Sequence, residues 1–355
     1  MIYPKFPENN ATIGVCAPSA GIGYKEESYN NSIAAICRSG YNVKETLSVR
    51  NDSNPSADSI TRGNEFNSLI EDPDVDMIIA AAGGDYNIDM LQYTNASSLI
   101  SHPKWVMGAS DPTNILYYMT TKLDIATLYG QNAGSFDWSP LHKSQENCLD
   151  LIGGILHEQS SYEKYAGSRE FINGKPDFDT EVYWTVLSPA DINYDTAKKH
   201  SLNDVNGYRE ADKVDISGRL IGGCADCIQN LIGTPYDGAS EFVSRYRHDG
   251  IIWYFDPFKM DAADLYRLIT QMKYAEYFDG TRLMIFGRVM FTEGSEDFEY
   301  ISLLAKALRD LGGNGIPFIW NADIGHVKPS MTLINGAFAN VVTNNGKGRI
   351  SMKLI

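Results

Sequence analysis

A serine in the setting of a nucleophile lies in the segment HPKWVMGASDPTNIL, residues 102–116. An apolar strand is expected to end at Gly108, Ser110 lies in the turn, and Pro112 stands where it can open a helix at its first position. A strand–turn–helix of this kind exposes a hydroxyl and offers main-chain N–H groups to an oxyanion. The same pattern also arises when Ser110 or Asp111 is a plain helix cap, and on this segment alone the cap is the more common explanation.

A serine nucleophile needs a base, and the base needs an acid that orients it. Among the six histidines, His326 is the best candidate base, because it follows a short apolar strand and Gly325 lets the backbone approach closely. Asp256 ends the apolar run IIWYFD and is the candidate acid, although aspartate also starts turns. Ser110, His326 and Asp256 all lie just past an expected strand, where the active sites of α/β sheets collect.

Two further motifs have weaker implications. The glycine step AAAGGDYN, residues 80–87, lacks both G-x-G-x-x-G and G-K-[ST], so it predicts no dinucleotide or nucleotide-phosphate loop. Its main-chain N–H groups at Gly83 and Gly84 are candidates for half of an oxyanion hole. Cys224 and Cys227 form a CxxC without a second cysteine or histidine pair nearby, which favours two small buried residues over a metal site. We therefore expect no metal and no cofactor.

The composition excludes several classes of protein. Lys+Arg 30 against Asp+Glu 45 gives a net charge of −15, which argues against nucleic acid or an anionic membrane as the main partner. Hydrophobic residues at 43% and charged residues at 21% are typical of a folded globular protein. No apolar run approaches the roughly 18 residues of a membrane span, and the first residues do not resemble a signal peptide. The five scattered cysteines favour a cytoplasmic location.

The elements that must position these residues alternate between strand and helix. In the first half, strands are expected at 11–17, 42–48, 76–82 and 105–107, and helices at 28–39, 60–70, 88–91 and 114–121. This order predicts a parallel α/β sheet of the Rossmann or flavodoxin kind for residues 1–160. Residues 161–213 read as an irregular connection or substrate loop. Residues 214–355 predict a mixed, β-rich domain, with the active site in the cleft between the two domains.

Taken in order along the chain, the motifs resemble the serine peptidase family of LD-carboxypeptidases, and more closely its microcin-immunity branch. The segments that carry the resemblance are TIGVCAPSAG at 12–21, AAGGD, PKWVMGASDPTNIL, SGRLIGGCADCIQNLIGTPYD at 217–237, IIWYFD, FGRVMF and GHVKPSMTLINGAFANV. Several blocks in the same order are more specific than any one of them. The resemblance implies the two-domain α/β fold given above and a Ser-His-acid triad.

Position by position, the resemblance makes Ser110 the nucleophile, His326 the base and Asp256 the acid. It assigns the oxyanion to the main-chain N–H groups of Asp111 and of Gly83 or Gly84. The family has Glu where this chain has Asp256, so the carboxylate is set back by about 1.5 Å, one C–C bond. Carboxypeptidase members carry Arg just before the Gly-Gly, where this chain has Ala81 and Ala82.

The resemblance also implies that Trp184 lines the substrate site and that the chain forms a homodimer. The predicted function is a cytoplasmic serine hydrolase that cleaves an amide next to a carboxylate or an aminoacyl-nucleotide-like group, as in self-immunity or detoxification. One alternative is a cytoplasmic LD-carboxypeptidase that trims muropeptides. The other is a catalytically weak binding protein, because a misplacement of the acid can cost on the order of 100-fold in rate.

Overall fold

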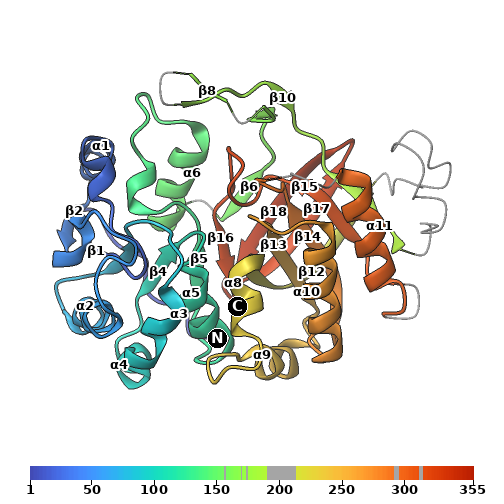
Figure 1. Cartoon of the computed structure of the whole chain (residues 1–355), viewed down its shortest axis with the longest axis horizontal. Helices are drawn as coiled ribbons and strands as arrows, with labels where there is room; N and C mark the ends of the chain where they lie inside the picture. The colour runs from blue at the N-terminus through green and yellow to red at the C-terminus, as the bar shows by residue number, and fades with distance from the viewer. Residues whose placement is uncertain (156, 169, 173–174, 190–212, 292–295, 312–314) are drawn as a thin grey trace.

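Two β-sheets form the frame of the molecule (Figure 1). The computed structural model describes residues 1–155, 157–168, 170–172, 175–189, 213–291, 296–311 and 315–355. The first sheet and its helices occupy the left of Figure 1, and the second sheet with the later helices occupies the right. None of the helices in these described ranges is long and apolar enough to cross a membrane.

The first sheet has six strands in the order β16-β5-β4-β3-β1-β2. Strands β1 to β5 pair in parallel, and β16 joins β5 antiparallel. Every residue of β3 and β4 is buried, as expected when helices cover both faces of a parallel sheet. The strands are β1 (Thr12–Cys16), β2 (Asn42–Glu45), β3 (Met77–Ala80), β4 (Trp105–Gly108), β5 (Thr127–Tyr129) and β16 (Leu333–Asn335).

The second sheet has eight strands in the order β11-β15-β14-β13-β12-β17-β18-β6. Its centre, β12 to β15, is parallel, and the outer strands pair antiparallel. The strands are β6 (Glu158–Ser160), β11 (Thr185–Leu187), β12 (Lys213–Cys224), β13 (Ile251–Asp256), β14 (Thr281–Gly287), β15 (Phe318–Ala322), β17 (Phe338–Asn344) and β18 (Lys347–Lys353). Two small pairs lie apart, β7 (Lys164–Tyr165) with β10 (Thr180–Glu181) and β8 (Phe171–Ile172) with β9 (Lys175–Pro176).

Some of the helices begin at a side chain that caps them. Asp58 accepts from the main-chain N–H of Thr61 at the start of α2, and Asp261 accepts from that of Asp264 at the start of α10. The α-helices are α1 (Glu26–Arg38), α2 (Ser59–Glu71), α3 (Asn87–Met90), α4 (Ala96–Ser101), α5 (Thr113–Thr121), α6 (Lys143–Ile152), α8 (Ala225–Leu231), α9 (Ala239–Tyr246), α10 (Ala262–Tyr274) and α11 (Asp297–Leu308). Short 3-10 turns are η1 (Gly23–Lys25), η2 (Leu47–Arg50), η3 (Leu91–Tyr93) and η4 (Ala133–Ser135).

Helix α5 lies between the two halves of the molecule. All nine of its residues are buried, because it packs on β4 and β5 of the first sheet and on β12 and α8 of the second. A helix with no solvent-facing side is an interior helix. The turn that precedes α5 carries Ser110, so the candidate nucleophile is attached to one of the most enclosed elements of the chain.

The chain crosses between the sheets near its end. After β15 it leaves the second sheet, adds β16 to the first sheet, and then returns to form β17 and β18 (Figure 1). Asn335 in β16 fixes this crossing. Its amide oxygen accepts from the N–H of Gly222 at 3.1 Å and from the hydroxyl of Tyr254 at 2.8 Å, and its amide nitrogen donates to Thr127 Oγ1 at 3.4 Å.

The fold class predicted from the sequence is confirmed: a parallel α/β sheet comes first and a mixed, β-rich sheet follows. Strand β5 and helices α4, α6 and α9 were not expected, because each is short or weakly apolar in sequence. The expected connection at 161–213 carries short strands over its described part, and residues 190–212 lie outside the described residues. The division of the chain into residues 1–160, 161–213 and 214–355 remains a prediction.

Candidate active site

The turn between β4 and α5 holds Ser110 in a strained conformation. Its φ is 67°, in the left-handed region that residues with a side chain rarely adopt. The carbonyl of Ser110 accepts from the N–H of Thr113 at 2.9 Å, so the turn closes directly into α5. A Cβ built on Gly108 would lie 2.7 Å from that of Pro112, so this sharp turn requires glycine there. Strain of this kind is typical of a nucleophile elbow.

Free main-chain donors surround this turn. Within the described part of the chain, the N–H groups of Gly83, Gly84 and Asp111 have no hydrogen-bond partner. Gly83 lies against the serine, since a Cβ built on it would be 3.1 Å from Ser110 Oγ. Gly84 has a φ of 145°, and a Cβ there would be 2.2 Å from Ser19 Oγ, so only glycine fits. Unpartnered donors beside a hydroxyl are the chemistry that an oxyanion needs.

The Asp111 side chain holds neighbouring loops together. Its carboxylate accepts from the Ser19 hydroxyl, from the N–H of Asn87 at 2.7 Å and from the Asn114 amide at 2.9 Å. Burial raises the pKa of Asp111, and the hydrogen bonds from Ser19 and Asn87 only partly oppose that rise. All three donors are neutral. The side chain therefore acts as a structural anchor, while its main-chain N–H remains free.

Asp256 is the last residue of β13 and is fully buried. Its Oδ2 accepts from the hydroxyl of Tyr129 and lies 2.7 Å from Nδ1 of His326. Its Oδ1 accepts from the main-chain N–H of His326 at 3.2 Å. Burial alone would raise the pKa of Asp256, but the charge of His326 and these hydrogen bonds outweigh it, and the pKa is lowered. The carboxylate is thus held in its ionised form.

Gly325 and Phe258 fix the position of His326 beside the Asp256 carboxylate. Gly325 has a φ of 97°, and a Cβ on it would lie 1.9 Å from Asp256 Oδ1, so glycine lets the backbone pass over the carboxylate. The imidazole stacks on the ring of Phe258, with ring centroids 4.1 Å apart. Although Nδ1 is close to Oδ2, its N–H direction is poorly aligned, and Nδ1 makes no hydrogen bond of normal geometry. The contact is an ion pair only when the imidazole carries its second proton.

Tyr129 connects the candidate acid to the turn that carries the candidate nucleophile. Its hydroxyl donates to Asp256 Oδ2 and accepts from the main-chain N–H of Ser110 at 3.4 Å. The ring is buried at the end of β5, 127 residues before the carboxylate that it contacts. One phenolic oxygen thus joins the serine turn of the first sheet to the acid of the second sheet. No pattern in the sequence marks this residue.

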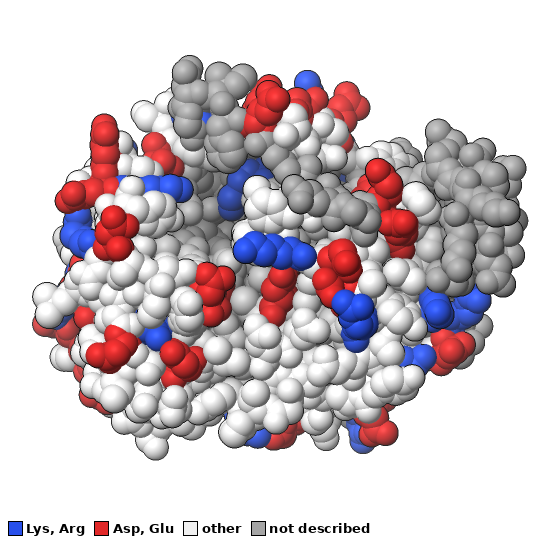
Figure 2. All heavy atoms as spheres, viewed as in Figure 1, with Lys and Arg blue, Asp and Glu red and all other residues white. Residues whose placement is uncertain are grey.

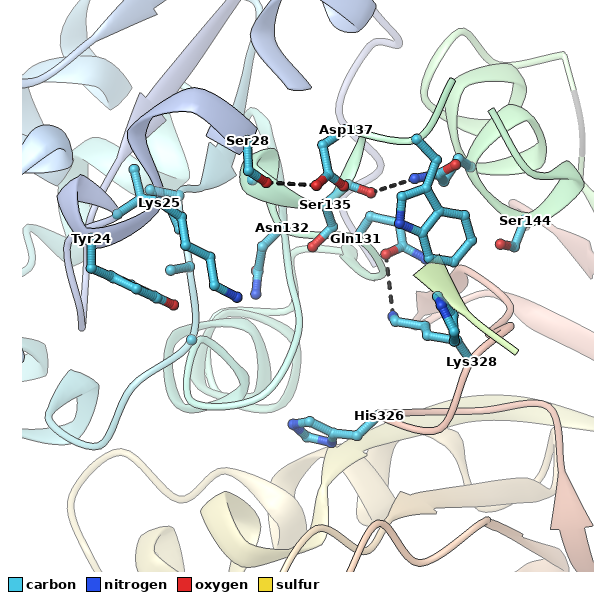
Figure 3. A pocket seen from close by; sticks show the side chains of 18 residues that line it. Tyr24, Lys25, Ser28, Gln131, Asn132, Ser135, Asp137, Ser144, His326 and Lys328 are labelled. Carbon is cyan, nitrogen blue, oxygen red and sulfur yellow. Dashed lines mark hydrogen bonds between the residues drawn. The ribbon is translucent and has the colours of Figure 1, made fainter. Parts of the chain in front are cut away.

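A cavity of about 330 Å³ opens beside these groups (Figure 3). Gly83 and His326 line it, so it adjoins both the free N–H groups and the imidazole. Its other walls include Gln131, Trp138 and Lys328. In Figure 3 the His326 and Lys328 side chains come from one segment and face the Gln131–Asn132 side of the cavity. Figure 2 shows a hollow in this face with both acidic and basic side chains at its edge.

Trp184 lies apart from this cavity. It is 1% exposed and its indole N–H donates to Asp323 Oδ2 at 3.0 Å, so it belongs to the core under β15. It is not among the residues that line the cavity, where the tryptophan is Trp138. Nothing in the sequence pattern marks Trp138 as a cavity residue, since the segment after η4 has no regular pattern.

The Cys224–Cys227 pair packs below the serine turn. Cys227 Sγ lies 3.6 Å from the carbonyl oxygen of Ser110, and the main-chain N–H of Cys224 donates to Thr113 Oγ1 at 3.0 Å. Both thiols are buried. Over the described ranges, no three His, Cys, Asp or Glu side chains lie close enough together to hold a metal ion. The pair therefore supports the turn from beneath by packing.

Comparison with protein families identifies both halves of the chain. The model of the LD-carboxypeptidase N-terminal domain matches residues 13–130, and that of the LD-carboxypeptidase C-terminal domain matches residues 217–341.

Individual curated proteins and solved structures are also similar to this chain. A putative carboxypeptidase of Vibrio cholerae is 26% identical over 242 residues, 66% of each chain. The microcin C7 self-immunity protein MccF of Escherichia coli is 25% identical over 280 residues, which is 77% of this chain and 72% of that protein. The structure of MccF in complex with aspartyl sulfamoyl adenosine superposes with a TM-score of 0.73 at 20% identity, covering 99% of both chains.

Proposed function

Because the chain belongs to the LD-carboxypeptidase family, we propose that it is a serine hydrolase that cleaves an amide next to a carboxylate or an aminoacyl-nucleotide-like group. The observation that carries this proposal is the position of Asp256. Its carboxylate contacts His326 and, through the hydroxyl of Tyr129, is connected to the main chain of Ser110. Similarity to carboxypeptidases and to a protein solved with an aminoacyl sulfamoyl nucleoside supports the substrate class.

In the proposed mechanism, Ser110 Oγ attacks the carbonyl carbon while His326 Nε2 takes its proton. The main-chain N–H groups of Asp111 and of Gly83 or Gly84 bind the oxyanion of the tetrahedral intermediate. His326 then gives the proton to the leaving amine, and Asp256 stays ionised to stabilise the imidazolium. Water hydrolyses the acyl-enzyme by the same proton transfers in reverse order.

Replacement of the nucleophile tests the proposal. We expect Ser110→Ala to lower kcat on the order of 1,000-fold or more, because the hydroxyl forms the covalent bond. Three substrates separate the candidate activities: dipeptide amides, aminoacyl-sulfamoyl adenylates and muropeptide tetrapeptides. Release of D-Ala from the muropeptide would assign the cell-wall carboxypeptidase activity instead of immunity. Ser101→Ala, on a partly exposed face of α4, is the matched control, and turnover by Ser110→Ala at the wild-type rate would refute the mechanism.

The second candidate is a binding protein with weak catalysis. The misaligned contact between His326 Nδ1 and the short side chain of Asp256 favours it. Calorimetry with an aminoacyl-sulfamoyl adenylate distinguishes the two functions. Tight binding by the wild type with no turnover assigns the binding role, and a gain of turnover in Asp256→Glu would then identify the length of the acid as the cause. The cytoplasmic location and the homodimer remain predictions.

A further inference from the structure

Lys328 places an ammonium group inside the cavity, two residues after His326. Its Nζ donates to Gln131 Oε1 at 3.2 Å, as Figure 3 shows, and to Ser330 Oγ at 3.2 Å. An ammonium has three N–H donors, and both of these acceptors are neutral. The third donor has no partner in the described ranges of the chain. Lys328 is therefore fixed in direction while one of its donors remains available.

The charge of Lys328 has no counter-ion within ion-pair distance. No carboxylate of the described residues lies within 4 Å of its Nζ. The acid on the cavity wall, Asp137, accepts from Ser28 at 2.6 Å, and Asp256 is already engaged with His326 and Tyr129. Burial lowers the pKa of Lys328, and the charge of Asp256 opposes that change. A partly buried cation without a carboxylate is costly unless a ligand supplies the negative charge.

Among the residues that line the cavity, Lys328 is the one best placed to attract an anion. Lys25 also lines the cavity, but its side chain is exposed, so water screens its charge. Ala81 and Ala82 line the cavity as well and offer no charge. In a chain with a net charge of −15, attraction for an anion must come from such a local group. A single ammonium matches a single negative charge, which is the charge of a carboxylate.

We propose that Lys328 Nζ binds the free carboxylate of the substrate, so that the cavity selects amides that carry a carboxylate close to the bond being cleaved. This inference rests on the proposed hydrolase function and adds the residue that recognises the carboxylate. Gln131 and Ser330 position the ammonium. The carboxylate accepts a charge-assisted hydrogen bond, which is roughly twice as strong as a neutral one.

The test compares a dipeptide with a free carboxylate and the same dipeptide as its neutral carboxamide. We expect Lys328→Met to lower kcat/KM for the carboxylate substrate by about 10- to 100-fold, the usual range for losing a charged hydrogen bond, and to change the carboxamide by less than about 3-fold. Lys328→Arg keeps the charge and should recover most of the difference. Lys44→Met, far away on β2 and paired with Asp72, controls for net charge.

A binding measurement separates this inference from the hydrolase proposal. In the Ser110→Ala background, calorimetry with the carboxylate dipeptide requires no turnover. Weaker binding in Ser110→Ala/Lys328→Met supports the subsite even if the wild type is not a hydrolase. Equal losses for carboxylate and carboxamide would overturn the inference, since they would indicate a structural lysine. It would equally be overturned if adenosine monophosphate, and not the dipeptide, lost affinity with Lys328→Met, because the anion would then be a phosphate.

Discussion

Two buried aspartates near the serine turn show opposite behaviour. Asp111 follows Ser110 directly and accepts hydrogen bonds only from neutral groups, and its pKa is raised by burial. Asp256 comes from the other sheet and is buried even more completely, yet its pKa is lowered because it faces His326. Burial removes both carboxylates from water at a cost in free energy. Only Asp256 faces a group that can carry a positive charge and offset that cost.

The difference teaches that burial does not decide the role of a carboxylate. A buried acid with neutral donors fixes loops and gains little from its charge. A buried acid that faces an imidazole stabilises the positive charge that forms there during proton transfer. Asp111 is adjacent to the serine, but its side-chain partners assign it to the structure of the turn.

The largest expected effect is the difference in kcat between the two variants that each neutralise one of these aspartates. Asp256→Asn should lower kcat on the order of 1,000-fold or more, because the imidazolium loses its counter-charge and its orientation. Asp111→Asn should lower kcat by less than about 10-fold, because Asn114 can turn its unpartnered Oδ1 to accept from the new amide. The measurement is kcat on the best substrate, with thermal unfolding to show that both variants fold. Equal losses in the two variants would contradict the division of roles.

A smaller effect is expected from the tyrosine between the two sheets. Tyr129→Phe removes the hydroxyl from Asp256 and from the N–H of Ser110, and we expect a loss of about 10- to 100-fold in kcat with little change in KM. Tyr254→Phe is the matched control, since its ring lies 5.8 Å away and its hydroxyl bonds Asn335 instead. Each variant should lose about 1–3 kcal/mol of stability. A positioning role for Tyr129 fails if both variants retain full activity at equal stability.

The smallest effect is the dependence of stability on pH. The raised pKa of Asp111 means that the folded protein takes up its proton first, so this group adds stability as pH falls from that pKa toward the ordinary value of 3.8. The lowered pKa of Asp256 means that its contribution is complete above 3.8 and is lost as pH falls through the folded pKa. Unfolding free energies of the wild type minus each Asn variant should therefore slope in opposite directions with pH. Slopes of the same sign would show that the two environments are alike.

Local patterns in the sequence predict the parts of the site that lie within one segment. The strand, turn and helix around Ser110 follow from an apolar run, a small polar turn and a proline at the helix start. These interactions depend on residues near one another in sequence. The glycine before His326 is also visible in the sequence, but its cause is distant, because the backbone must pass close to the carboxylate of Asp256 at the end of β13.

The contacts that join the halves could not be predicted in this way. Strand β5 has three residues and gives no periodic pattern, so Tyr129 had no assigned position. Its hydroxyl bond to Asp256 joins groups 127 residues apart, which no local pattern encodes. Lys328 was missed for another reason: one lysine between Val327 and Pro329 is ordinary in sequence until the fold shows that, among the described residues, no carboxylate lies beside it. The burial of Trp184 depends in the same way on distant packing.

The return of the chain through β16 bears on how such a protein can evolve. A gene that exchanged the second half for that of a relative would also replace the edge strand of the first sheet and the Asn335 bridge to Thr127. We therefore expect the two halves to work only as a matched pair, not as modules that can be exchanged freely. New specificity should arise more readily by changing single side chains on the cavity wall than by swapping domains.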